Sequence, residues 1–284
     1  MVFNNYSELK IGFTTQNFNL AMPNSVSNLK EIIEYASKEG FHFIQLRDDF
    51  ASLTNEDCIE IAGAARKNNI QVFYEIQKNP LDTGYFRAFN NALRNLSHFS
   101  EPRFLRVMVS NSEFVNDLNK KGWNEIEFSQ LTRILDSCSL IADETNIRLI
   151  IENSNEAIFG EKDSYFGLND LFANTEHVGF QFDIGNPFRK ASRDKADPDK
   201  VEQFLATLGH RWVSAHLKTI LDFGGEMQVS LTENPLSIER VIELMGRQNV
   251  KYVSIEQKAL PDKEECLRNH KTSIRFLRDL GVLQ

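Results

Sequence analysis

Four ionisable side chains stand at equivalent places in the second half of this 284-residue sequence: Glu152, Asp183, His216 and Glu256. Each follows a run of apolar residues, and successive members lie 31, 33 and 40 residues apart. A carboxylate is costly to remove from water, and aspartate is a poor strand former. Each residue alone is also typical of a turn or a helix cap, so it is their recurrence that indicates a common site.

The four residue types favour a metal site. Three carboxylates within a few ångströms repel one another unless they bind protons or a cation neutralises them. One imidazole with several carboxylate oxygens favours Mn²⁺ or Mg²⁺, and Co²⁺ and Zn²⁺ are also compatible. Beside a carbonyl group such a site supports proton transfer, because the metal polarises the carbonyl while carboxylates remove and return the proton. We predict that the four residues bind one divalent ion.

The elements that would position these residues alternate between short apolar runs and amphipathic helical patterns. The apolar runs predict eight strands, at 11–15, 41–46, 70–76, 103–109, 147–152, 178–183, 212–218 and 251–256. The helical patterns lie near 28–39, 54–65, 83–96, 131–141, 168–174, 198–208, 235–246 and 262–280. This alternation predicts an α/β fold with a parallel sheet, and eight units in this length predict a (β/α)₈ TIM barrel, a single domain over residues 1–284. The alternative is an open, doubly wound sheet.

The last three apolar runs favour the barrel. Apolar side chains there alternate with small or polar ones, and the polar series ends in Asp183, His216 and Glu256. Successive side chains of a strand point to opposite faces, so these three share the inward face, whereas Val213 is assigned to the helix-covered face. The carboxyl ends of barrel strands converge on one mouth, where barrel active sites lie.

Composition excludes several classes of function. The formal net charge is −8 and no block of like charges occurs, which argues against nucleic acid as the main partner. The three cysteines form no CxxC pair, which is typical of buried thiols in a reducing compartment. The first residues, MVFNNYSELKIGF, have no basic segment followed by an apolar one, and no run approaches the roughly 18 apolar residues of a membrane span. We expect a cytoplasmic protein that binds neither nucleic acid nor membrane.

The segments SNLKEIIEYASKEGFHFIQL, IRLIIEN, VGFQFDIGN, WVSAHLKT and YVSIEQ resemble the xylose isomerase-like TIM barrels. This sugar phosphate isomerase/epimerase superfamily also contains the AP endonuclease family 2 enzymes, and the resemblance covers almost the whole chain. It implies that Glu152, Asp183, His216 and Glu256 bind one divalent metal and that the two glutamates exchange the proton, as in ketose epimerases. It further implies a sugar or sugar phosphate isomerase or epimerase that works through an enediolate, with a small-molecule carbohydrate as substrate. A homo-oligomer is expected by analogy alone.

Three positions depart from the family's pattern. Gln45 stands where glutamate is frequent at the end of the second strand. Asn186 gives D-x-x-N in place of D-x-x-H after the sixth strand, and Thr219 replaces the aspartate of H-x-K-D after the seventh.

Polar residues near the predicted ligands are candidates for binding substrate. Asn186 and Lys218 lie just past ligands and are the first candidates, followed by Arg47 and Arg106. Arg106 lies in mid-strand, where an unpaired cation is costly, so its alternative role is an ion pair with an inward carboxylate such as Glu75.

Three other functions remain open. The same kind of site can dehydrate a hydroxy-ketone or a cyclic polyol ketone, as dehydratases of this superfamily do. An AP endonuclease needs further histidines at the ends of the second and third strands, which here read Gln45–Arg47 and Tyr74–Glu75, and an Asp-x-His pair that does not follow His216. A barrel that binds sugar without turnover is the third.

Overall fold

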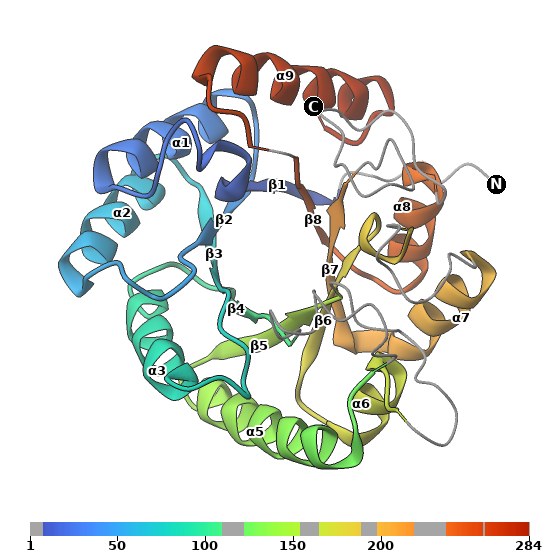
Figure 1. The fold of residues 1–284 in the computed structure, drawn as a ribbon. Coiled ribbons are helices and arrows are strands. Elements are labelled where there is room, and N and C mark those ends of the chain that lie inside the picture. The colour runs from blue at the N-terminus through green and yellow to red at the C-terminus, as the bar shows by residue number, and fades with distance from the viewer. Residues whose placement is uncertain are drawn as a thin grey trace.

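The computed structural model describes residues 8–109, 122–153, 165–188, 198–218, 237–257 and 259–283. Eight parallel strands form a closed barrel in the order of the chain, with helices around it (Figure 1). Closure is direct, because β1 pairs with both β2 and β8. The predicted TIM barrel is therefore confirmed, and the open sheet is excluded.

The predicted strands and helices are all present, with small shifts at their ends. The strands are β1 (Lys10–Thr14), β2 (Phe43–Arg47), β3 (Gln71–Ile76), β4 (Arg103–Val107), β5 (Ile147–Glu152), β6 (Gly179–Asp183), β7 (Trp212–Leu217) and β8 (Tyr252–Ile255). The α-helices are α1 (Val26–Lys38), α2 (Asn55–Lys67), α3 (Tyr85–Leu96), α5 (Glu125–Asp143), α6 (Leu168–Asn174), α7 (Pro198–Leu208), α8 (Ile238–Arg247) and α9 (Lys263–Asp279). Short 3₁₀ turns are η2 (Thr15–Phe18), η3 (Asn186–Phe188) and η4 (Gly209–Arg211).

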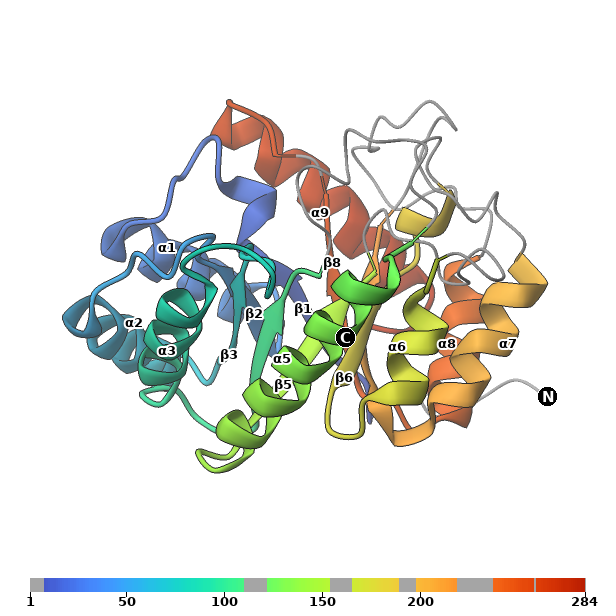
Figure 2. The same ribbon diagram turned by 60° about the horizontal axis from the view of Figure 1, so that its bottom comes forward.

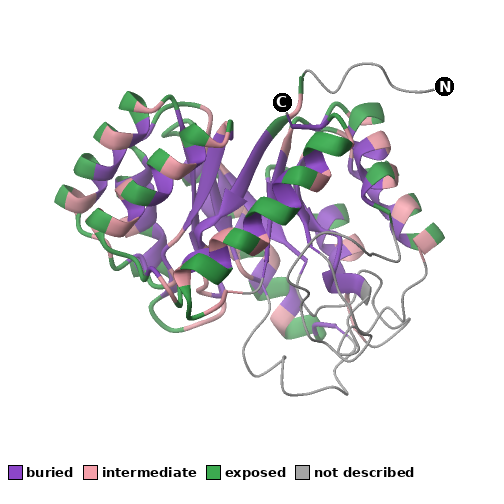
Figure 3. Ribbon diagram, turned by 90° about the horizontal axis from the view of Figure 1, so that it is seen from above, coloured by how far each residue is buried: buried purple, intermediate pink, exposed green. Residues whose placement is uncertain are grey.

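Local sequence explains where helices begin and which face they bury. At the start of α2, Thr54 accepts a hydrogen bond from the Asp57 N–H, and Asp57 accepts one from the Thr54 N–H, which is a capping box. On α1 the residues Leu29, Ile32, Ile33 and Ala36 recur at helical spacing and are all buried. Figure 2 shows such helices lying along the outside of the strands, and Figure 3 shows that they bury their barrel-facing sides and expose the others.

The barrel interior has an apolar lower layer, toward the amino ends of the strands. Phe43, Phe73, Phe104, Ile150 and Val213 form a separate buried cluster with Tyr252 against it. The assignment of Val213 to the helix-covered face is therefore wrong. The register between β6 and β7 shifts between Phe180 and Gln181, and this irregularity turns Val213 toward the interior. Gly179 leaves room for it, because a Cβ there would lie 2.8 Å from Val213 Cγ2.

Above this layer the interior is polar. Gln45, Glu75, Arg106 and Ser254 each follow a member of the apolar layer by two residues on the same strand, and all four are buried. Alternation along a strand places them on the same inward face, nearer the carboxyl ends of the strands. The barrel thus has an apolar floor and a polar upper part, and the predicted site residues lie in the latter.

The three cysteines are buried, as their sequence context predicted. Cys58, Cys138 and Cys266 are buried free thiols. None of the described helices combines the length and the apolar character that crossing a membrane would require. Thr219 and the first seven residues of the chain lie outside the described residues. The predictions made from Thr219 and from the start of the sequence are therefore not tested by the structure.

Candidate metal centre

Four adjacent strands bring Glu152, Asp183, His216 and Glu256 together at the carboxyl end of the barrel. Glu152 and Asp183 are the last residues of β5 and β6, His216 is the penultimate residue of β7, and Glu256 directly follows β8. One ligand atom from each lies within 4.8 Å of the others. All four side chains are buried, with Asp183 and His216 0% exposed. The expected convergence is therefore present in the structure.

His216 lies at the centre of this group. Its Nδ1 is 2.8 Å from Glu152 Oε1, 2.8 Å from Glu256 Oε2 and 3.8 Å from Asp183 Oδ2. Burial lowers the pKa of an imidazole, but here the charge of Glu152 and hydrogen bonds to the other carboxylates outweigh burial and raise the pKa of His216 well above its usual value. The carboxylates therefore favour the protonated, positively charged imidazole.

Asp183 is held by the turn that follows β6. Its Oδ1 accepts hydrogen bonds from the N–H groups of Gly185 and Asn186, both at 2.8 Å. Its backbone N–H and carbonyl both bond to the side chain of Asn153, at 2.7 and 2.9 Å. This arrangement directs Oδ2 toward the shared centre, where it lies 3.0 Å from Lys218 Nζ. Asp183 therefore has two roles at the end of its strand: Oδ1 caps the following turn, and Oδ2 is a candidate metal ligand.

Lys218 is a buried cation beside the candidate ligands. Its Nζ lies 2.5 Å from Glu256 Oε1 and 3.3 Å from Asn186 Oδ1, in addition to the contact with Asp183. Burial would raise the pKa values of Asp183 and Glu256, but the positive charge of Lys218 outweighs burial, with His216 adding to it. The pKa of Asp183 is lowered and that of Glu256 lies well below its usual range, so both are carboxylates at neutral pH.

Arg106 forms the ion pair that its mid-strand position predicted. It pairs with Glu75, and its second terminal nitrogen donates to Glu152 Oε2 at 2.6 Å. Thr14 donates to the other oxygen of Glu75 at 3.1 Å. Burial lowers the pKa of Arg106, and the two carboxylates more than reverse that effect, so its pKa is raised. Arg106 thus anchors one oxygen of Glu152 and leaves the other to the central group.

The donor set fits a divalent metal. Oxygen ligands of Mg²⁺ lie at about 2.1 Å, so opposite ligands of one ion are roughly 4.2 Å apart, close to the observed spread of 4.8 Å. The charges also fit, because Lys218 and a divalent ion together balance the carboxylates of Glu152, Asp183 and Glu256, while Arg106 offsets Glu75. Three carboxylates and one imidazole form a hard-leaning set of ligands.

A small polar pocket of about 170 Å³ opens over this group. Its described lining consists of Gln16, Arg47, Gln77, Arg106, Met108, Glu152, Asn186, Lys218 and Glu256. All four predicted substrate residues therefore reach the pocket, although Arg47 also pairs with Asp49 at 2.7 Å. The sequence did not single out Gln77 and Met108, although each directly follows a strand, the position that identified the other site residues.

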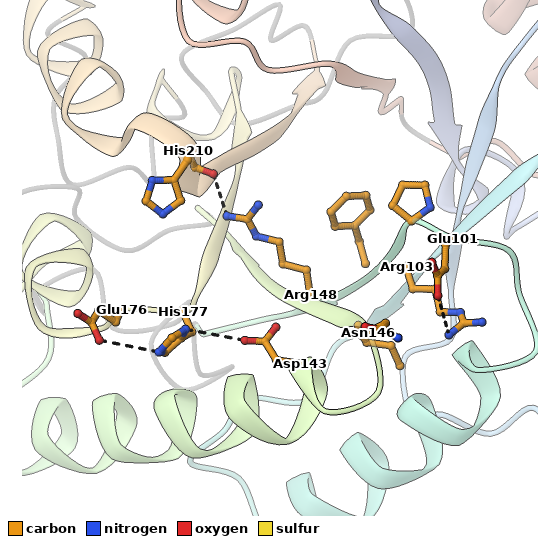
Figure 4. Close-up of a pocket in the computed structure, with 11 residues that line it drawn as sticks. Glu101, Arg103, Asp143, Asn146, Arg148, Glu176, His177 and His210 are labelled. Atoms are coloured by element: carbon orange, nitrogen blue, oxygen red, sulfur yellow. Dashed lines mark hydrogen bonds and ion pairs between the residues drawn. The ribbon is translucent and has the colours of Figure 1, made fainter.

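A larger hollow of about 560 Å³ lies at the opposite end of the barrel (Figure 4). Its walls carry Arg103, Asp143, Arg148, His177 and His210, among others. The ion pairs there are long, with His177 3.8 Å from both Asp143 and Glu176. None of the predicted site residues line this hollow, so the volume of a pocket does not by itself identify the candidate active site.

Comparison with solved structures shows a shared fold at low sequence identity. D-psicose 3-epimerase from Clostridium cellulolyticum, solved with D-tagatose, matches with a TM-score of 0.67 and 12% identity over 97% of this chain and 100% of that one. A xylose isomerase-like TIM barrel protein from Mycobacterium smegmatis in complex with magnesium matches with a TM-score of 0.69 and 12% identity, over 98% and 99% of the two chains. An AP endonuclease of family 2 from Brucella melitensis matches with a TM-score of 0.59 and 12% identity, over 91% and 96%.

These likenesses confirm the fold of the xylose isomerase-like barrels. No protein-family model matches the chain, and no curated protein sequence matches it. Sugar epimerases and an endonuclease share the fold, so function has to be argued from the site. An AP endonuclease needs histidines at the ends of the second and third strands. The described ends of β2 and β3 carry Gln45, Arg47, Tyr74 and Glu75 and no histidine.

Proposed function

We propose that this protein is a divalent-metal-dependent isomerase or epimerase of a sugar or sugar phosphate, which moves a proton next to a carbonyl through an enediolate. The observation that carries the proposal is the convergence of four ligand atoms within 4.8 Å at the mouth of the barrel. Structural neighbours described as a D-psicose 3-epimerase and as a magnesium complex of a xylose isomerase-like barrel support a sugar substrate and a metal.

The proposed ligands are Glu152, Asp183, His216 and Glu256, with Mn²⁺ or Mg²⁺ favoured by their oxygen-rich set. Such an ion, when bound, polarises a substrate carbonyl and acidifies the neighbouring C–H bond. Asp183 and His216 are ligands without a further role. The hydrogen bonds that fix Asp183 Oδ1 and orient its backbone keep this part of the site in place.

Glu152 and Glu256 are the proposed proton carriers. One oxygen of Glu152 is bound by Arg106 and one oxygen of Glu256 by Lys218, and the other oxygen of each faces the centre. One glutamate removes the proton from carbon, and the other returns it. Return to the same carbon from the opposite face gives epimerisation, whereas return to the adjacent carbon gives aldose–ketose isomerisation.

The pocket walls supply the proposed contacts to substrate oxygens. Asn186 and Lys218 lie beside the ligands, and Arg47 and Arg106 also line the pocket. Lys218 is the strongest candidate, because its ammonium group touches two proposed ligands and so lies next to any oxygen that the centre binds.

Exchange of deuterium from solvent into candidate ketoses tests this function. We expect the protein loaded with Mn²⁺ to introduce deuterium next to the carbonyl without loss of water from the sugar, and to interconvert the epimers or isomers. A new enone absorbance would indicate the dehydratase instead. Binding of ketoses with no exchange and no enone across neutral and phosphorylated substrates would contradict catalysis. Sedimentation in the same buffer would test the expected homo-oligomer.

A further inference from the structure

Gln45 contacts the side of the His216 ring that faces away from the carboxylates. Gln45 lies on β2, which is not one of the four strands that carry the candidate ligands, and is 0% exposed. Its Oε1 lies 2.5 Å from His216 Nε2 and also accepts a hydrogen bond from Ser254 Oγ at 2.7 Å. The amide thus joins β2 to β7 and β8 beneath the pocket.

The contacts of the imidazole determine what each ring nitrogen can do. Nδ1 faces oxygens of Glu152 and Glu256, both at 2.8 Å, so it is the nitrogen directed at the candidate metal centre. Nε2 faces an amide oxygen, which accepts a hydrogen bond and never donates one. When Nδ1 binds a metal, the ring proton lies on Nε2, and a turned amide would then place its NH₂ group against that N–H, so oxygen is the atom that fits this position.

We propose that Gln45 is a positioning residue: by accepting the Nε2–H of His216, it fixes the ring so that Nδ1 is the nitrogen presented to a divalent metal. This inference rests on the proposed metal-dependent function. Partners of this kind hold the tautomer and the orientation of a metal-binding histidine, and their loss costs about 10–100-fold in metal affinity. Ser254 supports the arrangement, because its hydroxyl donates to the same Oε1 and holds the amide in place.

The amide suits the charge of this site. The centre already contains three carboxylates, and a fourth at residue 45 would add negative charge at full burial, which is costly without another cation. Glutamine provides the same acceptor oxygen without a charge. In this chain glutamine therefore contacts His216 without adding a charge to the site.

Titration of the metal-free protein with Mn²⁺ tests the proposal. We expect Gln45→Leu, which removes the acceptor of the Nε2–H, to weaken Mn²⁺ binding by about 10–100-fold. The matched control is Gln181→Leu. Gln181 is also 0% exposed and inward-facing, and its amide has no hydrogen-bond partner among the described residues, so it makes no hydrogen bond with His216. We expect this control to bind Mn²⁺ within about twofold of the wild type.

A second readout identifies the ligating nitrogen without measuring activity. In the protein loaded with ¹¹³Cd²⁺ and labelled with ¹⁵N-histidine, we expect scalar coupling from the metal to Nδ1 of His216 and a slowly exchanging proton on Nε2. In Gln45→Leu we expect that proton to exchange faster.

The possible results separate this inference from the proposed function. Unchanged Mn²⁺ affinity in Gln45→Leu, or coupling to Nε2 in the wild type, would overturn the role of Gln45 and leave the reaction standing. Tight Mn²⁺ binding that depends on Gln45, together with no proton exchange into any ketose, would overturn the reaction alone. No Mn²⁺ binding by the wild type would overturn both.

Discussion

Two histidines of this barrel are equally buried and chemically opposite. His216 and His270 are both 0% exposed. His270, on α9, packs among aromatic rings such as Phe13, 4.7 Å away, and contacts the Tyr35 hydroxyl through Nδ1 at 2.9 Å. Burial lowers the pKa of His270 to about 3, whereas the carboxylates around His216 raise its pKa well above the usual value.

The comparison shows that burial does not identify a functional histidine, whereas the charge around it does. An imidazole among aromatic rings is kept neutral and contributes packing and one hydrogen bond. An imidazole among three carboxylates occupies a place that attracts protons or metal ions. If this distinction is correct, changes at the two regions have separable effects on catalysis, stability, metal affinity and pH dependence.

Removing the charge of either proposed proton carrier is expected to have the largest effect. Glu152→Gln and Glu256→Gln each lose a general base but keep nearly the same shape, so deuterium exchange should fall by about 10²–10⁴-fold. The measurement is the initial rate of exchange at saturating Mn²⁺, with His270→Gln as the matched change in the other region. Loss of deuterium exchange in a folded His270→Gln variant would contradict the claim that His270 has no part in catalysis.

Removing the cation that anchors the site is expected to cost stability. Arg106→Met leaves Glu75 and Glu152 as buried carboxylates without their partner, and we expect the free energy of unfolding in urea to fall by about 3–5 kcal/mol. Arg47→Met, which breaks the more exposed pair with Asp49, should cost less than about 1 kcal/mol. Equal losses of unfolding free energy in the two variants would show that the buried ion pairs of Arg106 contribute no more to stability than the exposed pair of Arg47.

Metal affinity separates the two histidines directly. His216→Ala removes a proposed ligand, and Mn²⁺ affinity should fall by more than about 100-fold, beyond the range for residues that only orient a ligand. His270→Gln should bind Mn²⁺ as the wild type does. Isothermal titration of both variants decides the matter, and equal affinities would contradict the assignment of His216.

The pH dependence of stability gives the smallest effect, with a defined sign. Because the folded-state pKa of His270 is depressed to about 3, its contribution is present above the unfolded value near 6.5 and is lost as pH falls toward 3. Between pH 7 and pH 5 this loss amounts to about 2 kcal/mol. His216 has the opposite sign in the metal-free protein: its contribution is complete below about 6.5 and is lost as pH rises through its raised folded pKa.

Urea unfolding between pH 7 and pH 5 measures this effect. Glutamine at residue 270 keeps a polar group for the Tyr35 hydroxyl and removes the titration, so His270→Gln should flatten the acid side of the stability curve. The carboxylates with lowered pKa values, Asp183 and Glu256, lose their contribution only at lower pH and are common to both proteins. An unchanged slope in the variant would contradict a neutral His270.

The sequence predicted the late half of the site better than the early half, for a physical reason. Glu152, Asp183, His216 and Glu256 end apolar runs, and one rule, convergence of strand ends in a barrel, places them together. The contact of Gln45 with His216 crosses the barrel from β2 to β7, and that of Arg106 with Glu152 joins the neighbouring strands β4 and β5. The existence of both contacts depends on side-chain reach and not on position along a strand. The inward turn of Val213 also escaped prediction, because a local shift in register breaks the two-residue alternation.

Anomalous diffraction from crystals grown with Mn²⁺ tests the central assignment most directly. We expect one strong peak about 2.0–2.4 Å from oxygens of Glu152, Asp183 and Glu256 and from Nδ1 of His216. The Nε2–H of His216 should still donate a hydrogen bond to Gln45. A fully occupied Mn²⁺ peak elsewhere, with these four side chains still held together by Lys218 and Arg106 alone, would contradict it.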